Sequence, residues 1–94
     1  MHLETQDTIL VVSGIQELTA VNATETKTNI KEALKEIHTR IDVDLSSTSF
    51  IDSSGLGVLI GLHKAMATKN GSIRIVNPTD SVQQVLELTR LHRL

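Results

Sequence analysis

Two neighbouring serines in the segment Asp52-Ser53-Ser54-Gly55-Leu56-Gly57 are the hydroxyl groups best placed for chemistry. The segment follows the apolar pair Phe50-Ile51 and leads into an apolar stretch that predicts a helix. Asp and Ser are residue types that favour helix N-caps, so we expect the serines near unpaired amide groups and the positive end of the helix dipole. Two interpretations follow: either a serine only caps the helix, or one hydroxyl faces solvent and accepts a phosphoryl group, whose charge a helix N-terminus tolerates.

The same predicted helix contains three glycines, Gly55, Gly57 and Gly61. Each interior glycine costs about 1 kcal/mol relative to alanine, which indicates that the glycines serve another purpose. Gly57 and Gly61 are four residues apart and share a helix face, which we expect to let another backbone or a partner approach closely. Helix-on-sheet packing and partner contact are both open interpretations. The core side of the helix is expected to consist of Leu56, Leu59, Ile60 and Met66.

Other catalytic and ligand-binding chemistry is poorly matched, so no catalytic residue, metal site or cofactor is predicted. Gly55-x-Gly57-x-x-x-Gly61 is one residue too long at its last spacing for a dinucleotide fingerprint. No Lys-Ser/Thr pair follows these glycines, as a phosphate-binding loop requires. A triad of Ser53, His63 and Asp52 has no separate orienting group, because Asp52 and Ser53 are adjacent. The histidines lack metal-ligand spacing and are interpreted as surface residues: His2, His38, His63 and His92.

Three segments have the periodicity or capping signals of helices. In the first, predicted over residues 22–38, Asn22 and Glu25 resemble a capping box, and one face carries Ile30, Ala33, Leu34 and Ile37. The second runs from Asp52 to about Lys69 and is closed by Asn70-Gly71 in a left-handed position. The third opens at Pro78-Thr79-Asp80-Ser81 and has one face formed by Val82, Val85, Leu86 and Thr89.

Strands are predicted near Leu3–Thr5, over Thr8–Val12, over Ile41–Leu45 with Asp42 and Asp44 on the polar side, and over Ile73–Val76. The predicted order is β-β-α-β-α-β-α. Strands that alternate with helices imply right-handed crossovers, which place consecutive strands parallel. We therefore expect an α/β fold in which residues 1–94 form a single small domain, with helices packed on a mixed, mostly parallel sheet.

Composition excludes several partners. The chain has 94 residues, a net charge of -2 and Phe50 as its only aromatic residue, so it lacks the basic surface and the stacking rings that favour nucleic acid.

The chain has no cysteine and therefore no disulfide framework. The first ten residues show no signal-peptide pattern, and the longest uncharged stretch, residues 53–62, is half of the roughly 20 residues that a membrane span needs. We expect a cytoplasmic protein without direct membrane insertion.

The segment from Val43 to Met66, VDLSSTSFIDSSGLGVLIGLHKAM, resembles the signature of STAS domains. It is most similar to bacterial anti-sigma factor antagonists, in which a strand leads through a D-S-[ST]-G-L-G turn into a helix. The resemblance continues less sharply through Gly71-Ser72-Ile73 and Val82–Leu91. It implies a small α/β domain that acts by partner switching and is not an enzyme. In that scheme an anti-sigma factor serine kinase phosphorylates the serine after the Asp and is then released, and a PP2C-type phosphatase reverses the mark.

On this resemblance the phosphoacceptor is Ser53, and the partner-binding surface consists of Asp52, Ser53, Ser54, Gly55, Leu56, Gly57 and Gly61. Two features depart from the family. Glu17-Leu18-Thr19 stands where antagonists often carry Glu-Leu-Asp, and the last helix reads Thr89-Arg90-Leu91 without the usual Ser/Thr-Gly-Leu and final segment.

Two other functions remain open. The first is a structural STAS subunit of a lipid-transport ABC complex, in which the same turn and helix contact the ATPase and phosphorylation is incidental. The second is a nucleotide-binding enzyme, which the incomplete motifs favour least.

Overall fold

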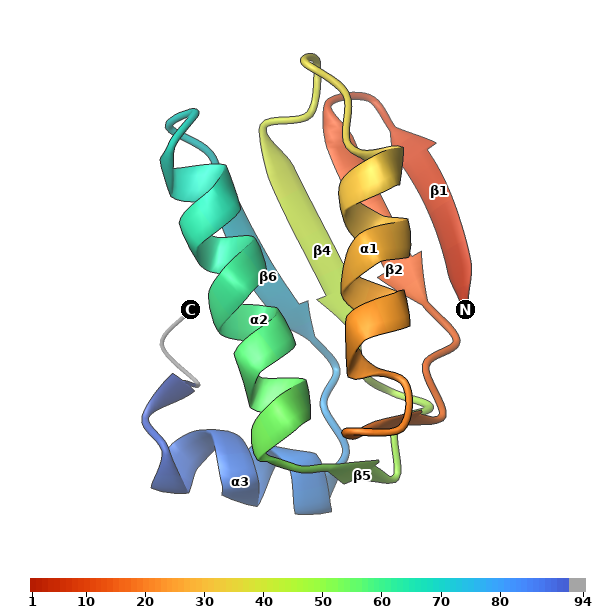
Figure 1. Cartoon of the computed structure of the whole chain (residues 1–94), viewed down its shortest axis with the longest axis vertical. Coiled ribbons are helices and arrows are strands. Elements are labelled where there is room, and N and C mark those ends of the chain that lie inside the picture. The colour runs from red at the N-terminus through yellow and green to blue at the C-terminus, as the bar shows by residue number, and fades with distance from the viewer. Residues whose placement is uncertain (92–94) are drawn as a thin grey trace.

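A mixed four-stranded sheet lies at the centre of the protein, whose computed structural model describes residues 1–91 (Figure 1). The strand order is β1-β2-β4-β6, with β1 antiparallel to β2 and the remaining pairs parallel. The strands are β1 (His2–Gln6), β2 (Ile9–Ser13), β4 (Arg40–Asp44) and β6 (Ser72–Val76). The predicted α/β class and mixed, mostly parallel sheet are confirmed.

Helices α1 (Ala23–Ala33) and α2 (Ser53–Ala67) lie side by side over one face of the sheet (Figure 1). Alternate residues of the strands point toward these helices and are buried: Leu10, Val12, Ile41, Val43 and Ile73. Helix α3 (Asp80–Leu88) packs against the short strand β5 (Phe50–Ile51) at one end of the sheet and buries Val82 and Leu86. Amphipathic elements bury their apolar faces in this shared layer, which forms the core.

A second, two-stranded sheet pairs β3 (Glu17–Leu18) with β5 (Phe50–Ile51) in parallel. These strands are too short to give a periodic pattern, and the sequence analysis did not predict them as strands. Strand β3 precedes α1 and β5 precedes α2, so their pairing brings the starts of both helices together. Leu18 and Ile51 are buried beneath the pair.

The first helix is shorter than predicted. It ends at Ala33 because Leu34 adopts an extended conformation with φ -68° and ψ 132°. The following turn is closed by His38, whose backbone N–H donates to Lys35 O and whose Nδ1 accepts the Lys35 N–H at 2.9 Å. Ile37, predicted on the buried face, is therefore 58% exposed.

Two further side-chain predictions were wrong about burial. Ile60 points away from the buried face of α2, which is formed by Gly55, Val58, Leu59, Leu62 and Met66. His38 is fully buried rather than on the surface, because its two ring nitrogens both find polar partners. His2 and His63 are exposed as predicted, and His92 lies outside the described residues.

The end of the second helix follows the prediction closely. Asn70, which comes just after α2, has φ 60° in the left-handed region. Within residues 1–91, no helix is long and apolar enough to cross a membrane.

Candidate functional site

Asp52 is the N-cap of α2. Its extended backbone, with φ -112° and ψ -172°, lets Oδ1 accept the Gly55 N–H at 3.0 Å, while Oδ2 accepts the Ala20 N–H at 3.0 Å. The hydrogen bond from Gly55, followed by that from Ala20, lowers the pKa of the Asp52 carboxyl group from its usual value. The carboxylate therefore stays ionised at neutral pH and joins the β3–α1 loop to the start of α2.

Ser53 and Ser54 are the first two residues of α2, and both are exposed. Because Asp52 supplies the cap, neither serine is needed for that role, and the capping interpretation of the serines is wrong. Among residues 1–91, neither hydroxyl group makes a hydrogen bond. Both hydroxyls are therefore accessible to a reagent or a partner.

The β3–α1 loop lies beside these serines and is held by Asn22. Its Oδ1 accepts the Thr19 N–H at 3.0 Å, and its Nδ2 donates to Glu17 O at 2.7 Å. The predicted capping box with Glu25 is wrong, because the Asn22 side chain braces the loop and makes no cap hydrogen bond to the helix. Thr19, which departs from the family pattern, is buried in this loop.

The three glycines of α2 have three different environments. A Cβ on Gly55 would collide with the backbone oxygen of Leu18 in β3, so Gly55 is where two backbones approach closely. A Cβ on Gly57 would meet nothing within 4 Å. At Gly61 a Cβ would lie 2.6 Å from Nζ of Lys27, a side chain of α1. The predicted shared close-approach face of Gly57 and Gly61 is therefore wrong with respect to a neighbouring backbone.

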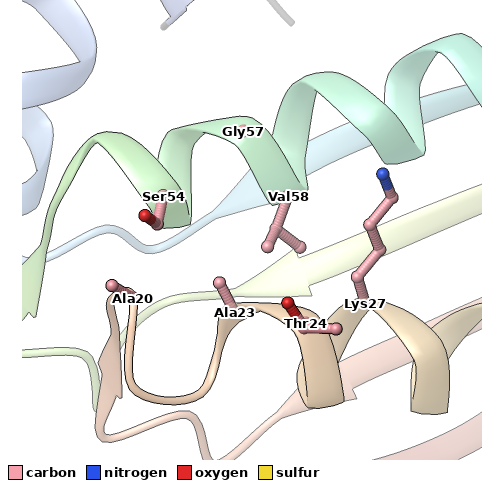
Figure 2. Close-up of a pocket in the computed structure, with 7 residues that line it drawn as sticks. All are labelled: Ala20, Ala23, Thr24, Lys27, Ser54, Gly57 and Val58. Carbon is pink, nitrogen blue, oxygen red and sulfur yellow. The ribbon is translucent and has the colours of Figure 1, made fainter.

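A pocket of about 330 Å³ opens between the N-terminal parts of α1 and α2. Figure 2 shows Ser54 at the start of α2, Val58 pointing from α2 toward α1, and Lys27 extending from α1 toward α2. The lining residues are Ala20, Ala23, Thr24, Lys27, Ser54, Gly57 and Val58.

The structure brings together only part of the predicted partner-binding set. Asp52, Ser53 and Ser54 meet at the helix start, and Gly57 is exposed one turn further along. Gly55 is buried against β3, whereas Leu56 and Gly61 are partly buried. The sequence analysis missed the α1 side of the pocket, since Thr24 and Lys27 have no spacing relation to the serine motif.

The family profile described as "STAS domain" matches residues 1–94. A Thermotoga maritima protein, a candidate anti-sigma factor antagonist, is 32% identical over 89 residues, which are 94% of this chain and 79% of that protein. The anti-sigma-B factor antagonist of Listeria monocytogenes is 29% identical over 70 residues, which are 70% of this chain and 61% of that protein.

Solved structures have the same fold. A crystal structure of a candidate anti-sigma factor antagonist from Thermotoga maritima has a TM-score of 0.91 at 28% identity, covering 99% of this chain and 80% of that one. The unphosphorylated form of the anti-sigma factor antagonist SpoIIAA has a TM-score of 0.86 at 24% identity, covering 98% of this chain and 82% of that one. By its profile match and these similarities, the chain belongs to the STAS domain family.

Proposed function

We propose that the chain is an anti-sigma factor antagonist that acts by partner switching and is not an enzyme. In its unphosphorylated form it binds an anti-sigma factor serine kinase in the cytoplasm through the surface at the start of α2. Phosphorylation of Ser53 releases the kinase, and a PP2C-type phosphatase restores the binding form. The Listeria relative, described as an anti-sigma-B factor antagonist, supports the proposed class of partner.

The observation that carries the proposal is the division of roles between Asp52 and Ser53. Asp52 already caps α2, whereas the exposed Ser53 hydroxyl makes no hydrogen bond within residues 1–91. A phosphoryl group can therefore be added without removing a contact that holds the fold. The positive end of the α2 dipole tolerates the added anion.

Charge at this position disrupts docking without unfolding the domain. A phosphoserine carries about -1.5 to -2 charges at pH 7 and three acceptor oxygens. It would stand beside Asp52, which is already ionised, so the helix start would change from a weakly to a strongly negative surface. A kinase surface that fits the unphosphorylated form then meets both repulsion and added volume.

Phosphate mapping tests the site. Incubation with the cognate kinase and ATP, followed by mass spectrometry, is expected to place one phosphate on Ser53 in the parent and in Ser54→Ala, and none in Ser53→Ala. Ser53→Ala should change the free energy of unfolding by less than about 0.5 kcal/mol, because the exposed hydroxyl makes no hydrogen bond within residues 1–91. Phosphate on Ser54 alone would contradict the assignment.

Titration calorimetry against the same kinase tests the switch. Ser53→Asp should weaken binding only in part, since aspartate carries about half of the phosphate charge, and the phosphorylated protein should bind more weakly still. Circular dichroism should show the parent fold for both. Undiminished affinity of both forms would contradict partner switching and would favour the alternative of a structural subunit in a lipid-transport ABC complex.

A further inference from the structure

Lys27 is an unusual lysine in this protein. Its side chain leaves α1 and crosses to α2, where Nζ lies 2.6 Å from the position that a Cβ on Gly61 would take (Figure 2). The side chain is partly buried, whereas Lys31, one turn further along α1, is exposed. The absence of a Cβ at Gly61 therefore leaves the space that the end of the Lys27 side chain, Cε and Nζ, occupies against α2.

The ammonium group of Lys27 has no protein partner within residues 1–91. The salt bridges in this part of the chain join other residues, and no hydrogen bond involves Lys27 Nζ. Partial removal of an ammonium group from water is unfavourable unless an opposite charge or an acceptor compensates for it. An anionic group bound beside Lys27 would compensate for this cost.

The pocket beside Lys27 has the chemistry of an anion site. Lys27 is the only charged residue among its seven lining residues, and Thr24 and Ser54 add hydroxyl donors. Both α1 and α2 begin at this end of the pocket, so their dipoles contribute positive potential, which the ionised Asp52 carboxylate partly offsets at the start of α2. Asp52 lies at the start of α2, but its two oxygens are engaged by the Gly55 and Ala20 N–H groups.

The pocket also explains why α2 has a glycine at position 57. Gly57 lines the pocket, it is exposed, and a Cβ at this position would meet nothing, so internal packing does not require a glycine. A side chain at Gly57 would instead occupy part of the pocket that a bound group needs.

We propose that this pocket binds an oxyanion, a carboxylate or phosphate group, with Lys27 as the counter-charge and Ser54 and Thr24 as hydrogen-bond donors. Two sources share this chemistry: a free phosphate ion and an acidic side chain of the docking kinase. The second source rests on the proposed function, because it makes the pocket a contact next to Ser53 in the complex with the kinase.

The first arm of the test uses inorganic phosphate alone and does not depend on the kinase. In ¹⁵N–¹H NMR titrations, phosphate should shift the Ser54 and Gly57 amides of the parent and of Lys31→Met in a saturable way. Lys27→Met keeps an apolar stem over Gly61 but removes the charge, so its apparent affinity should fall about tenfold. Thermal melts verify that all variants are folded.

The second arm measures affinity for the kinase in phosphate-free buffer. If the pocket receives an acidic side chain, Lys27→Met should weaken kinase binding about tenfold and Lys31→Met should not. Gly57→Leu should weaken binding as well, because the leucine would fill part of the pocket and its Cβ meets no neighbour within 4 Å.

The two arms separate the possible outcomes. Amide shifts with an unchanged kinase affinity identify a free-anion site, and a Lys27-dependent loss of kinase affinity without such shifts identifies a protein carboxylate. Absence of both effects overturns the anion site. A parent protein that binds no kinase contradicts the proposed function, while the phosphate titration still decides whether the pocket takes an oxyanion.

Discussion

His38 shows how one buried side chain can end a helix and join two layers. Its Nδ1 accepts the Lys35 N–H, so the neutral ring carries its proton on Nε2, which lies 2.9 Å from Thr5 Oγ1 in β1. A proton on Nδ1 would place two donors against each other and break the turn after α1. Desolvation by burial, then the charges of Lys69 and Lys35, lower the pKa of His38 from 6.5.

This lowered pKa predicts a loss of stability in mild acid. Well above pH 6.5 the ring is neutral in both the folded and the unfolded chain, so His38 contributes no pH dependence there. Below pH 6.5 the unfolded chain binds the proton first, so the free energy of unfolding should fall as the pH drops toward the lowered pKa of the folded state.

Urea denaturation between pH 7.5 and pH 5 measures this effect. His38→Gln should flatten the pH dependence, whereas His63→Gln, at an exposed position on α2, should leave it as in the parent. An equal pH dependence in the parent and His38→Gln would show that the buried imidazole is not the group responsible.

At the scale of elements, the start of α2 depends on its neighbour β3. Strands β3 and β5 pair for only two residues each, yet this pairing sets the Leu18 carbonyl against Gly55. The Asp52 carboxylate then accepts a hydrogen bond from the Ala20 N–H in the loop that follows β3. The helix that carries Ser53 is thus positioned by a segment more than 30 residues earlier in the chain.

The glycines of α2 should respond in opposite directions to the same substitution. Gly55→Ala forces its Cβ into the β3 backbone, which cannot move like a flexible side chain, and should cost roughly 1–3 kcal/mol. Gly57→Ala adds a Cβ in open space and improves helix propensity, so it should stabilise the protein by about 0.5–1 kcal/mol. Chemical denaturation of the parent and the two variants measures both changes in the free energy of unfolding. A loss of stability in Gly57→Ala would contradict the open environment of this position.

At the scale of the whole molecule, the two faces of the sheet are built differently. One face packs apolar residues under α1 and α2, while the opposite face carries Asp42 between Arg40 and Arg74. Asp42 Oδ1 accepts from Arg40 Nε at 2.7 Å, and Asp42 Oδ2 accepts from Arg74 Nη2 at 2.9 Å. Asp42 was predicted on the polar side of its strand, but the two arginines cover it and leave it 8% exposed.

This arrangement predicts unequal effects for the members of the cluster. Asp42→Ala leaves two guanidinium groups facing each other, and we expect a loss of roughly 1–3 kcal/mol, below the value for fully buried ions because both arginines reach solvent. Arg74→Met should cost less, since Arg40 still pairs with Asp42 and the methionine stem still covers the sheet. Unfolding in low and high salt measures both variants, and equal losses would contradict a central role for the carboxylate.

Local patterns by themselves determined the order of the main elements. Apolar periodicity, β-branched runs and capping residues together identified the strands of the four-stranded sheet and the three helices, because an element with one apolar face must bury it against another. Alternation of strands and helices predicted the parallel pairs that are observed. The residue types around Asp52 and Asn70 marked the start and the end of α2, since capping and left-handed turns depend on neighbouring residues.

Tertiary structure decided which residues form the site. The β3–β5 pairing, the hydrogen bond between His38 and Thr5, and that between Asp52 and Ala20 join residues 32 or more positions apart. Contacts between such distant residues produce no periodic pattern in the sequence. The same holds for the glycines, because spacing places Gly57 and Gly61 on one face but does not say what lies opposite. The β3–β5 pairing puts the Leu18 backbone against Gly55, whereas the packing of α1 beside α2 puts Lys27 against Gly61 and leaves an open pocket beside Gly57. Each environment depends on which distant element covers that turn of the helix.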